Sequence, residues 1–154
     1  MTLKPGIAAP DFTAYADDGK KISLKQFKGK KVILYFYPKD DTPGCTKEAC
    51  DFRDKQSNFV DHKTVVIGVS KDNQQSHTKF KNKYNLNFIL ISDEEGKICE
   101  AYGTWIEKSM YGKKYMGIDR ATFLINEKGV IDHIWRKVKV PGHIDEILNI
   151  IQPQ

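Results

Sequence analysis

The chain has 154 residues, of which 40% are hydrophobic and 29% are charged, and its formal net charge at pH 7 is +5. These values predict one globular domain over residues 1–154 that needs no disulfide staples, and the odd cysteine count of three argues against a secreted disulfide scaffold. The N-terminus lacks the apolar run of a signal peptide, and no apolar stretch of about 20 residues predicts a membrane helix, so we expect a cytoplasmic protein.

The positive charge comes from dispersed lysines and arginines that alternate with acids and carry no nucleic-acid motif, so we expect them to provide solubility. An alternative is a weak surface for an acidic reductase partner. The small clusters are Lys28-Lys30-Lys31, Lys113-Lys114 and Arg136-Lys137-Lys139.

The N-terminal part of the chain predicts a hairpin followed by a buried strand. Segments 12–15 and 21–23 flank the turn Asp17-Asp18-Gly19. Ser23 and Gln26 have the spacing of a capping box, which predicts one helical turn through residue 27. Residues 32–37 are all apolar, β-branched or aromatic, as is typical of a strand covered on both faces by helices.

The segment after this strand places a cysteine at a helix start. Thr42 suits the N-cap, Pro43 suits the first helical position, and Cys45 then falls in the first turn. Free amides and the positive end of the helix dipole favour an anion there, so this thiol should lose its proton more easily than a free cysteine. Cys45 is therefore a candidate thiolate, although many cysteines are simply small buried hydrophobic residues.

Ala49, Phe52, Phe59 and Val60 recur at helical spacing and predict the buried face of one long helix that ends near residue 61. Cys50 lies on the same predicted helix. Helix geometry places its Cα roughly 8 to 9 Å from that of Cys45, whereas a disulfide needs less than about 7 Å. The two cysteines cannot bond while the helix is intact.

The cysteine pair allows three interpretations. The helix excludes a permanent disulfide, and a zinc site is not expected because Cys99 and four scattered histidines supply no ligand cluster. The remaining interpretation is a switch, in which Cys45 reacts, the first turns of the helix unwind, and Cys50 resolves the product.

The middle of the chain alternates strands and helices. A second buried strand is predicted over residues 64–70, and a third over residues 87–91. Asp72 is expected to cap the helix between these two strands. The helix between them has the buried stripe Gln74, His77, Phe80 and Tyr84, in which His77 is interpreted as a packing residue. A short helix is predicted from residue 92 to 102, with Cys99 as a buried bystander or, alternatively, a backup resolving cysteine.

The segment 103–115 gives no clear pattern, although loops of this kind often border a site. Two strands are predicted over residues 116–125 and 130–138, with a turn between them. A closing amphipathic helix is predicted over residues 144–151. This order of elements predicts an α/β, thioredoxin-like fold with a central mixed sheet and helices on both faces.

The residues around Cys45 resemble a known family. Pro38, Thr42 and Cys45 fit the Pro-x-x-x-Thr-x-x-Cys signature of the peroxiredoxins, and a second cysteine five residues later resembles the bacterioferritin-comigratory (PrxQ) subgroup. The similarity extends over nearly the whole chain, from the opening segment 6–12 to segment 119–125.

The resemblance implies a thiol peroxidase that acts in antioxidant defence as a monomer without cofactor or metal. Cys45 would attack hydrogen peroxide or an organic hydroperoxide, become a sulfenic acid, and condense with Cys50 to a disulfide. Thioredoxin or a similar dithiol would then reduce that disulfide. A low-pKa thiol beside a resolving thiol suits this chemistry, because a sulfenic acid is reversible only if a thiol meets it first.

Ionisation alone cannot explain catalysis, because a free thiol is already a few per cent ionised at pH 7 and a lower pKa weakens the nucleophile. Donors around the departing oxygen should supply the larger effect, on the order of 3 kcal/mol each. Thr42, which is also expected to cap the helix, and Arg120, the family's distant arginine, are the predicted donors. Pro38 is expected to shape and shield the pocket, whereas Glu48 and Arg53 are interpreted as parts of solvated ion pairs.

Two other functions remain possible from the residues alone. A thioredoxin-type thiol–disulfide oxidoreductase would prefer a Cys-x-x-Cys pair, and here four residues separate the cysteines. The third hypothesis is a non-enzymatic redox sensor or chaperone-like protein that uses the same fold.

Overall fold

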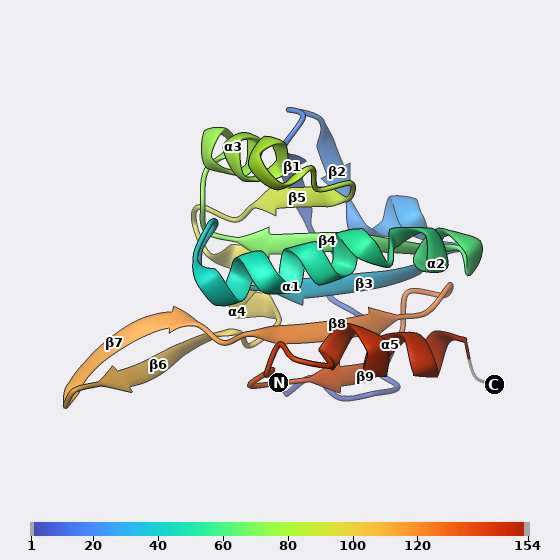
Figure 1. Cartoon of the computed structure of the whole chain (residues 1–154). Coiled ribbons are helices and arrows are strands. Elements are labelled where there is room, and N and C mark those ends of the chain that lie inside the picture. Colours follow the sequence, from blue (N-terminus) through green and yellow to red (C-terminus); the bar gives the residue numbers. More distant parts are fainter. Residues whose placement is uncertain (1, 153–154) are drawn as a thin grey trace.

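The structure of the chain is a computed structural model that describes residues 2–152. Its centre is a seven-stranded sheet with the order β2-β1-β5-β4-β3-β8-β9 (Figure 1). These strands are β1 (Thr13–Ala16), β2 (Lys21–Ser23), β3 (Lys31–Phe36), β4 (Thr64–Ser70), β5 (Ile89–Ser92), β8 (Ala121–Ile125) and β9 (Ile131–Trp135). Strands β3, β4 and β5 are parallel, and the other neighbours pair antiparallel, so the sheet is mixed as predicted.

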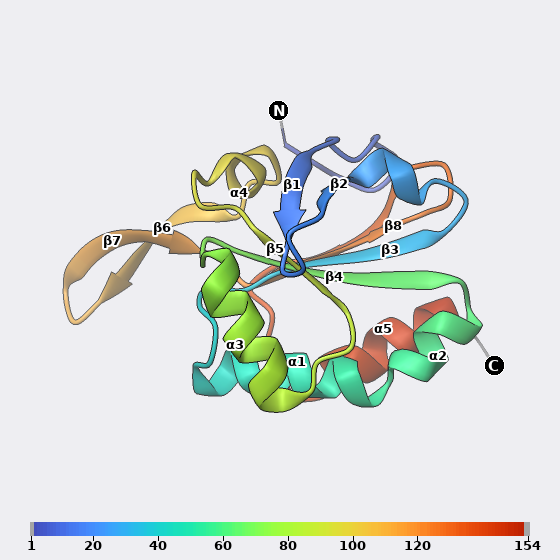
Figure 2. The ribbon, with the colours of Figure 1, turned by 90° about the horizontal axis from the view of Figure 1, so that it is seen from above.

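Helices cover both faces of this sheet, as the sequence predicts (Figure 2). Helices α1 (Pro43–Asp54), α2 (Gln56–Asp61), α3 (Gln74–Tyr84) and α5 (His143–Ile151) lie on one face. The short helix α4 (Lys97–Ala101) and the 3-10 turn η1 (Leu24–Phe27) lie on the other. None of the helices within residues 2–152 is long and apolar enough to cross a membrane.

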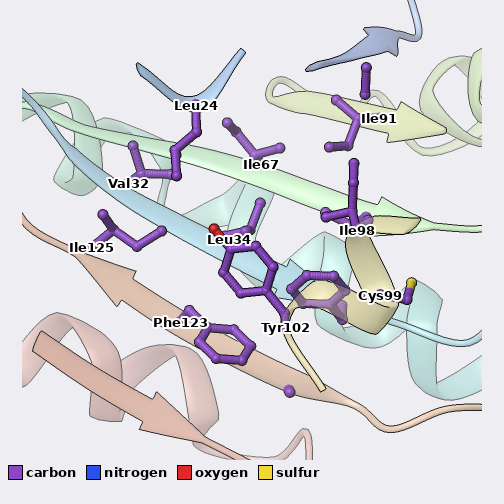
Figure 3. Packing of buried hydrophobic residues seen from close by; sticks show 14 of the residues in the cluster. Leu24, Val32, Leu34, Ile67, Ile91, Ile98, Cys99, Tyr102, Phe123 and Ile125 are labelled. Atoms are coloured by element: carbon purple, nitrogen blue, oxygen red, sulfur yellow. The ribbon is translucent and has the colours of Figure 1, made fainter. Parts of the chain in front are cut away.

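Strand β3 divides its side chains between two cores, because successive residues of a strand point to opposite faces. Val32, Leu34 and Phe36 pack with Tyr102 and other residues of the α4 side (Figure 3). Ile33 and its alternating neighbours pack under α1, α3 and α5, in the cluster that also contains Cys45. The strand that leads to Cys45 is thus buried on both sides.

The predicted long helix is wrong in one respect, because it breaks at Lys55 into α1 and α2. Asn87, in the loop before β5, bonds both sides of the break: its side chain donates to the Arg53 carbonyl and its carbonyl accepts from Gln56. The break also changes the buried face, since Phe59 is buried as predicted whereas Val60 is exposed.

The cap of α3 also differs from the prediction. Asn73, not Asp72, occupies the N-cap position, and its side chain accepts a hydrogen bond from the Ser76 amide. The Asp72 carboxylate instead accepts bonds from the Ser70 hydroxyl and the Asp40 amide.

The segment without a clear sequence pattern forms a second, two-stranded sheet from β6 (Trp105–Met110) and β7 (Lys113–Ile118). The predicted single strand over 116–125 is therefore wrong, because it divides into β7 and β8. At the division the Asp119 amide donates to the Thr104 carbonyl at 2.7 Å. This contact turns the chain into the main sheet directly before Arg120.

Candidate active site

Cys45 lies in the first turn of α1, and Thr42 and Pro43 occupy the N-cap and first helical positions, as predicted. The side chain is 2% exposed and packs in the core beneath α1. Cys50 lies in the same helix and is half-buried, and neither cysteine is in a disulfide. With both residues on one intact helix, their Cα atoms are roughly 8 to 9 Å apart.

Arg120 is the residue directly before β8, and its side chain extends to Cys45. One guanidinium nitrogen, Nη2, donates to the Cys45 sulfur at 3.4 Å, and Nη1 donates to the Glu48 carboxylate at 2.8 Å. A Cβ at position 44 would lie 3.1 Å from Nη2, so Gly44 leaves the room that the guanidinium occupies. Arg120 and Cys45 are thus brought together as the sequence predicts.

Glu48 is not part of a solvated pair, and that prediction is wrong. The residue is completely buried one helical turn after Cys45, with Oε1 on Arg120 and Oε2 without a partner within residues 2–152. Burial raises the pKa of Glu48 to about 7, against the opposing effect of Arg120. One guanidinium therefore serves two acidic groups, and one of them changes charge near neutral pH.

The Thr42 hydroxyl does not cap the helix, contrary to the prediction. It donates to the Lys39 carbonyl at 2.8 Å, so in this arrangement the hydroxyl is not the predicted donor to a departing oxygen. Its lone pairs remain to accept a hydrogen bond. The amides of Gly44 and Cys45 consequently have no acceptor within the described part of the chain. The helix start thus presents free amide donors next to the sulfur, beside the Arg120 guanidinium.

The loop that carries Thr42 is anchored by a buried network that sequence reasoning missed. Asp40 Oδ2 accepts from His77 Nδ1 at 2.7 Å and from the Ser76 hydroxyl at 2.8 Å, and Tyr37 donates to Oδ1 at 2.6 Å. His77 Nε2 faces the Ile91 carbonyl at 2.9 Å. The Asp40 carboxylate and the Ile91 carbonyl can only accept hydrogen bonds. His77 must therefore carry a hydrogen on both ring nitrogens, which makes it an imidazolium.

The charge of His77 agrees with its surroundings. Burial alone would lower the pKa of His77, but the hydrogen bond and charge of Asp40, together with the Ile91 carbonyl and the charge of Asp72, outweigh burial and raise it above the ordinary value. The sequence placed His77 correctly on the buried stripe of α3, but a charged partner 37 residues away leaves no local signal.

Asp40, Asp72 and His77 form the cluster in residues 2–152 that could hold a metal ion, with ligand atoms within 4.8 Å of one another. Both ring nitrogens of His77 already face protein oxygens. Asp40 and Asp72 likewise accept hydrogen bonds from neighbouring groups. The present hydrogen bonds therefore account for the cluster as an anchor of the loop.

Asp41, the next residue in the loop, is also tied to α3. Its carboxylate accepts from Lys83 at 2.8 Å and from the Tyr84 hydroxyl at 2.6 Å. The Tyr84 carbonyl in turn accepts from Arg53 at the far end of α1. Arg53 also pairs with Asp54, so only part of its role is the exposed ion pair that was predicted. The two ends of α1 are thus fixed to the same end of α3.

The remaining candidates lie away from this cluster. Cys99 is completely buried in α4 on the other face of the sheet, and burial, with a contribution from Asp93, raises its pKa strongly. It fits the predicted bystander. Pro38 is exposed in the loop after β3, and its shielding of the pocket stays a prediction.

Comparison with known proteins agrees with this geometry. Residues 5–134 match the AhpC/TSA family. A relative from Coxiella burnetii is 55% identical over 96% of this chain and 98% of its own length, and Peroxiredoxin Bcp of Bacillus subtilis is 50% identical over 99% and 97%. The solved structure of the Xanthomonas campestris bacterioferritin comigratory protein, described for its alkyl peroxide reduction activity, has a TM-score of 0.90 at 36% identity, covering 96% of this chain and 97% of that one. The chain therefore belongs to the AhpC/TSA family and, within it, to the Bcp and PrxQ peroxiredoxins, which are thiol peroxidases.

Proposed function

We propose that Cys45 is the peroxidatic residue and reduces hydrogen peroxide and organic hydroperoxides. The observation that carries this proposal is the contact between Arg120 and the Cys45 sulfur at a helix start with free amides. The Arg120 guanidinium and the free amides would stabilise negative charge on the sulfur and on a departing peroxide oxygen. Thr42, whose hydroxyl donates to the Lys39 carbonyl, would accept a hydrogen bond from the peroxide and so orient it.

In the first step the Cys45 thiolate attacks one peroxide oxygen, an S–O bond forms, and the O–O bond breaks. The departing hydroxide or alkoxide takes a proton and leaves as water or alcohol, and Cys45 becomes a sulfenic acid. The Arg120 guanidinium and the amides of Gly44 and Cys45 would stabilise the charge on that oxygen, with an effect on the order of 3 kcal/mol for one donor.

In the second step the Cys50 thiolate attacks the Cys45 sulfur, and hydroxide leaves as water when the disulfide forms. Because a disulfide requires Cα atoms less than about 7 Å apart, the first turns of α1 must unwind for this step. A dithiol such as thioredoxin then reduces the disulfide and becomes oxidised itself. We further propose that the chain acts as a monomeric, cytoplasmic, single-domain enzyme of antioxidant defence and redox homeostasis, with Pro38 shielding the pocket.

A pair of serine variants tests the roles of the three cysteines. Cys50→Ser should still reduce one equivalent of peroxide but lose sustained turnover with thioredoxin and its reductase, because the variant has no internal thiol at position 50 to convert the sulfenic acid into the disulfide that thioredoxin reduces. Cys99→Ser is the matched control and should cycle normally. Mass spectrometry of the peroxide-treated protein should locate the disulfide between Cys45 and Cys50. Normal cycling of Cys50→Ser would assign resolution to another thiol.

A further inference from the structure

The β6–β7 sheet projects from the body of the molecule as an arm (Figures 1 and 2). We call residues 105–118 the β6–β7 arm. Within residues 2–152 its two strands pair only with each other, from Trp105 and Ile118 at the base to Met110 and Lys113 at the tip. An isolated two-stranded sheet is only marginally stable in water. The outer part of the arm therefore contributes little to the fold, whereas Trp105 and Ile118 at its base pack in the core.

Apolar side chains are concentrated on this arm although it is exposed. Residues 2–152 contain seven large exposed hydrophobic side chains, and four of them lie on the arm: Met110, Tyr111, Tyr115 and Met116. Scattered single residues of this kind are normal on a protein surface, whereas a group on one projecting element indicates contact with a partner. Tyrosine and methionine are also enriched at protein interfaces.

Tyr111 at the tip contributes nothing to the core, and its backbone conformation is unfavourable. Its side chain is 98% exposed, and its backbone has a φ of 51° in a two-residue turn with Gly112, whose φ is 77°. Two positive φ values are typical of a type I′ turn, which favours asparagine, aspartate or glycine at the first position. A bulky tyrosine there costs conformational energy. Folding does not explain the residue, but recognition of a partner does.

The charge of the arm indicates the chemistry of that partner. The arm carries three lysines, Lys108, Lys113 and Lys114, against the single acid Glu107. Two copies of the arm would bring like charges together, which disfavours a dimer through this surface. An apolar contact surrounded by positive charge is complementary to a partner with an acidic rim.

The arm is also joined to the candidate active site. Strand β7 ends at Ile118, and Arg120, which contacts the Cys45 sulfur, follows after one further residue. The base of the arm and the start of α1 lie at the same end of the molecule (Figure 1). A protein bound to the arm would therefore have the oxidised cysteines within its reach.

We propose that the β6–β7 arm is the docking surface for the acidic dithiol protein that reduces the Cys45–Cys50 disulfide. The inference rests on the proposed function, since it names the surface that its last step uses. In that step the two partner thiols lose two electrons and two protons and form a disulfide, and Cys45 and Cys50 regain their thiols. Thioredoxin is the probe for this partner.

Two variants of the arm test the proposal. Lys113→Glu with Lys114→Glu reverses the charge, and Tyr111→Asn removes the aromatic ring while giving the turn a more favourable residue. Turnover with thioredoxin and its reductase should show a fall in kcat/KM for thioredoxin of about tenfold in the charge variant and a fall in Tyr111→Asn as well. The salt dependence of the wild-type reaction should weaken in the charge variant. Peroxide reduction supported by dithiothreitol should not change in either variant.

The matched control is Lys28→Glu with Lys30→Glu, an equal charge reversal beside the start of β3, where the strand is farthest from Cys45. This control should keep most of its kcat/KM for thioredoxin. An unchanged kcat/KM in both arm variants would overturn the proposal, and so would an equal loss with dithiothreitol, which would mean a distorted site. Concentration-dependent dimers that the arm variants abolish would assign the surface to a second copy instead. Failure of the wild type to reduce peroxide with dithiothreitol would contradict the proposed function, a result separate from all of these.

Discussion

At the scale of single residues, the site consists of one cation between two groups that can carry negative charge. Arg120 donates to the Cys45 sulfur and to the buried Glu48 carboxylate. Because the pKa of Glu48 is raised to about 7 by burial, Glu48 is neutral below this pH and anionic above it. When it ionises, it takes a larger share of the Arg120 charge and adds a second anion near the sulfur.

Replacement of Glu48 by glutamine tests this competition. Glu48→Gln keeps an oxygen that can accept from Arg120, but it carries no charge at any pH. The ratio of the variant's peroxide rate constant to that of the wild type should be near 1 below pH 6. The ratio should rise through pH 7 towards roughly tenfold, the equivalent of about one pKa unit. Stopped-flow measurement from pH 5.5 to 8.5 gives the ratio at each pH. A flat ratio would show that the charge of Glu48 does not act on the reaction.

At the scale of elements, α1 has fixed ends and a reactive first turn. The loop before it is held by Asp40 and Asp41 on α3, and its last turn is held by Arg53 on the Tyr84 carbonyl. Local unwinding therefore has defined limits, because the chain on both sides stays attached to the same helix. The buried pair of Asp40 and His77 is the strongest of these attachments by burial and by charge.

Removal of the imidazolium should damage both stability and activity. His77→Gln leaves the Asp40 carboxylate buried without its cation, which should cost about 3–5 kcal/mol of unfolding free energy. Ser76→Ala removes one hydrogen bond from the same Asp40 oxygen and should cost only about 1 kcal/mol. The peroxide rate constant should fall further in His77→Gln, because the loop that carries Thr42 loses its anchor. Equal costs in the two variants would exclude an ion pair.

The stability contributed by His77 also has a predicted pH dependence. Because its folded-state pKa lies above the ordinary value, the contribution is complete below about pH 6.5. It is lost as the pH rises through the folded-state pKa. The difference in unfolding free energy between the wild type and His77→Gln, measured by urea denaturation, should therefore shrink at alkaline pH. A difference that grows with pH would mean that His77 is neutral in the native state.

At the scale of the whole molecule, the sequence predicts the main sheet because its strongest signals are local. The apolar run 32–37, the start of α1 and the stripe of α5 each depend on neighbours in the chain, and the structure confirms them. The failures concern distant contacts. Glu48 has the sequence context of an exposed helix position, and its burial depends on Arg120, 72 residues away. The break at Lys55 is bridged by contacts with the distant Asn87, and the β6–β7 arm has no apolar period because most of its residues are exposed.

The central claim is that Cys45 is held at an intact helix start, out of reach of Cys50, until oxidation unwinds that helix. Amide hydrogen exchange of the reduced protein and of the Cys45–Cys50 disulfide form tests it directly. The account predicts that the disulfide form loses protection over residues 43–51, while β4 and α3 keep theirs. Unchanged protection over residues 43–51 in the disulfide form would contradict it.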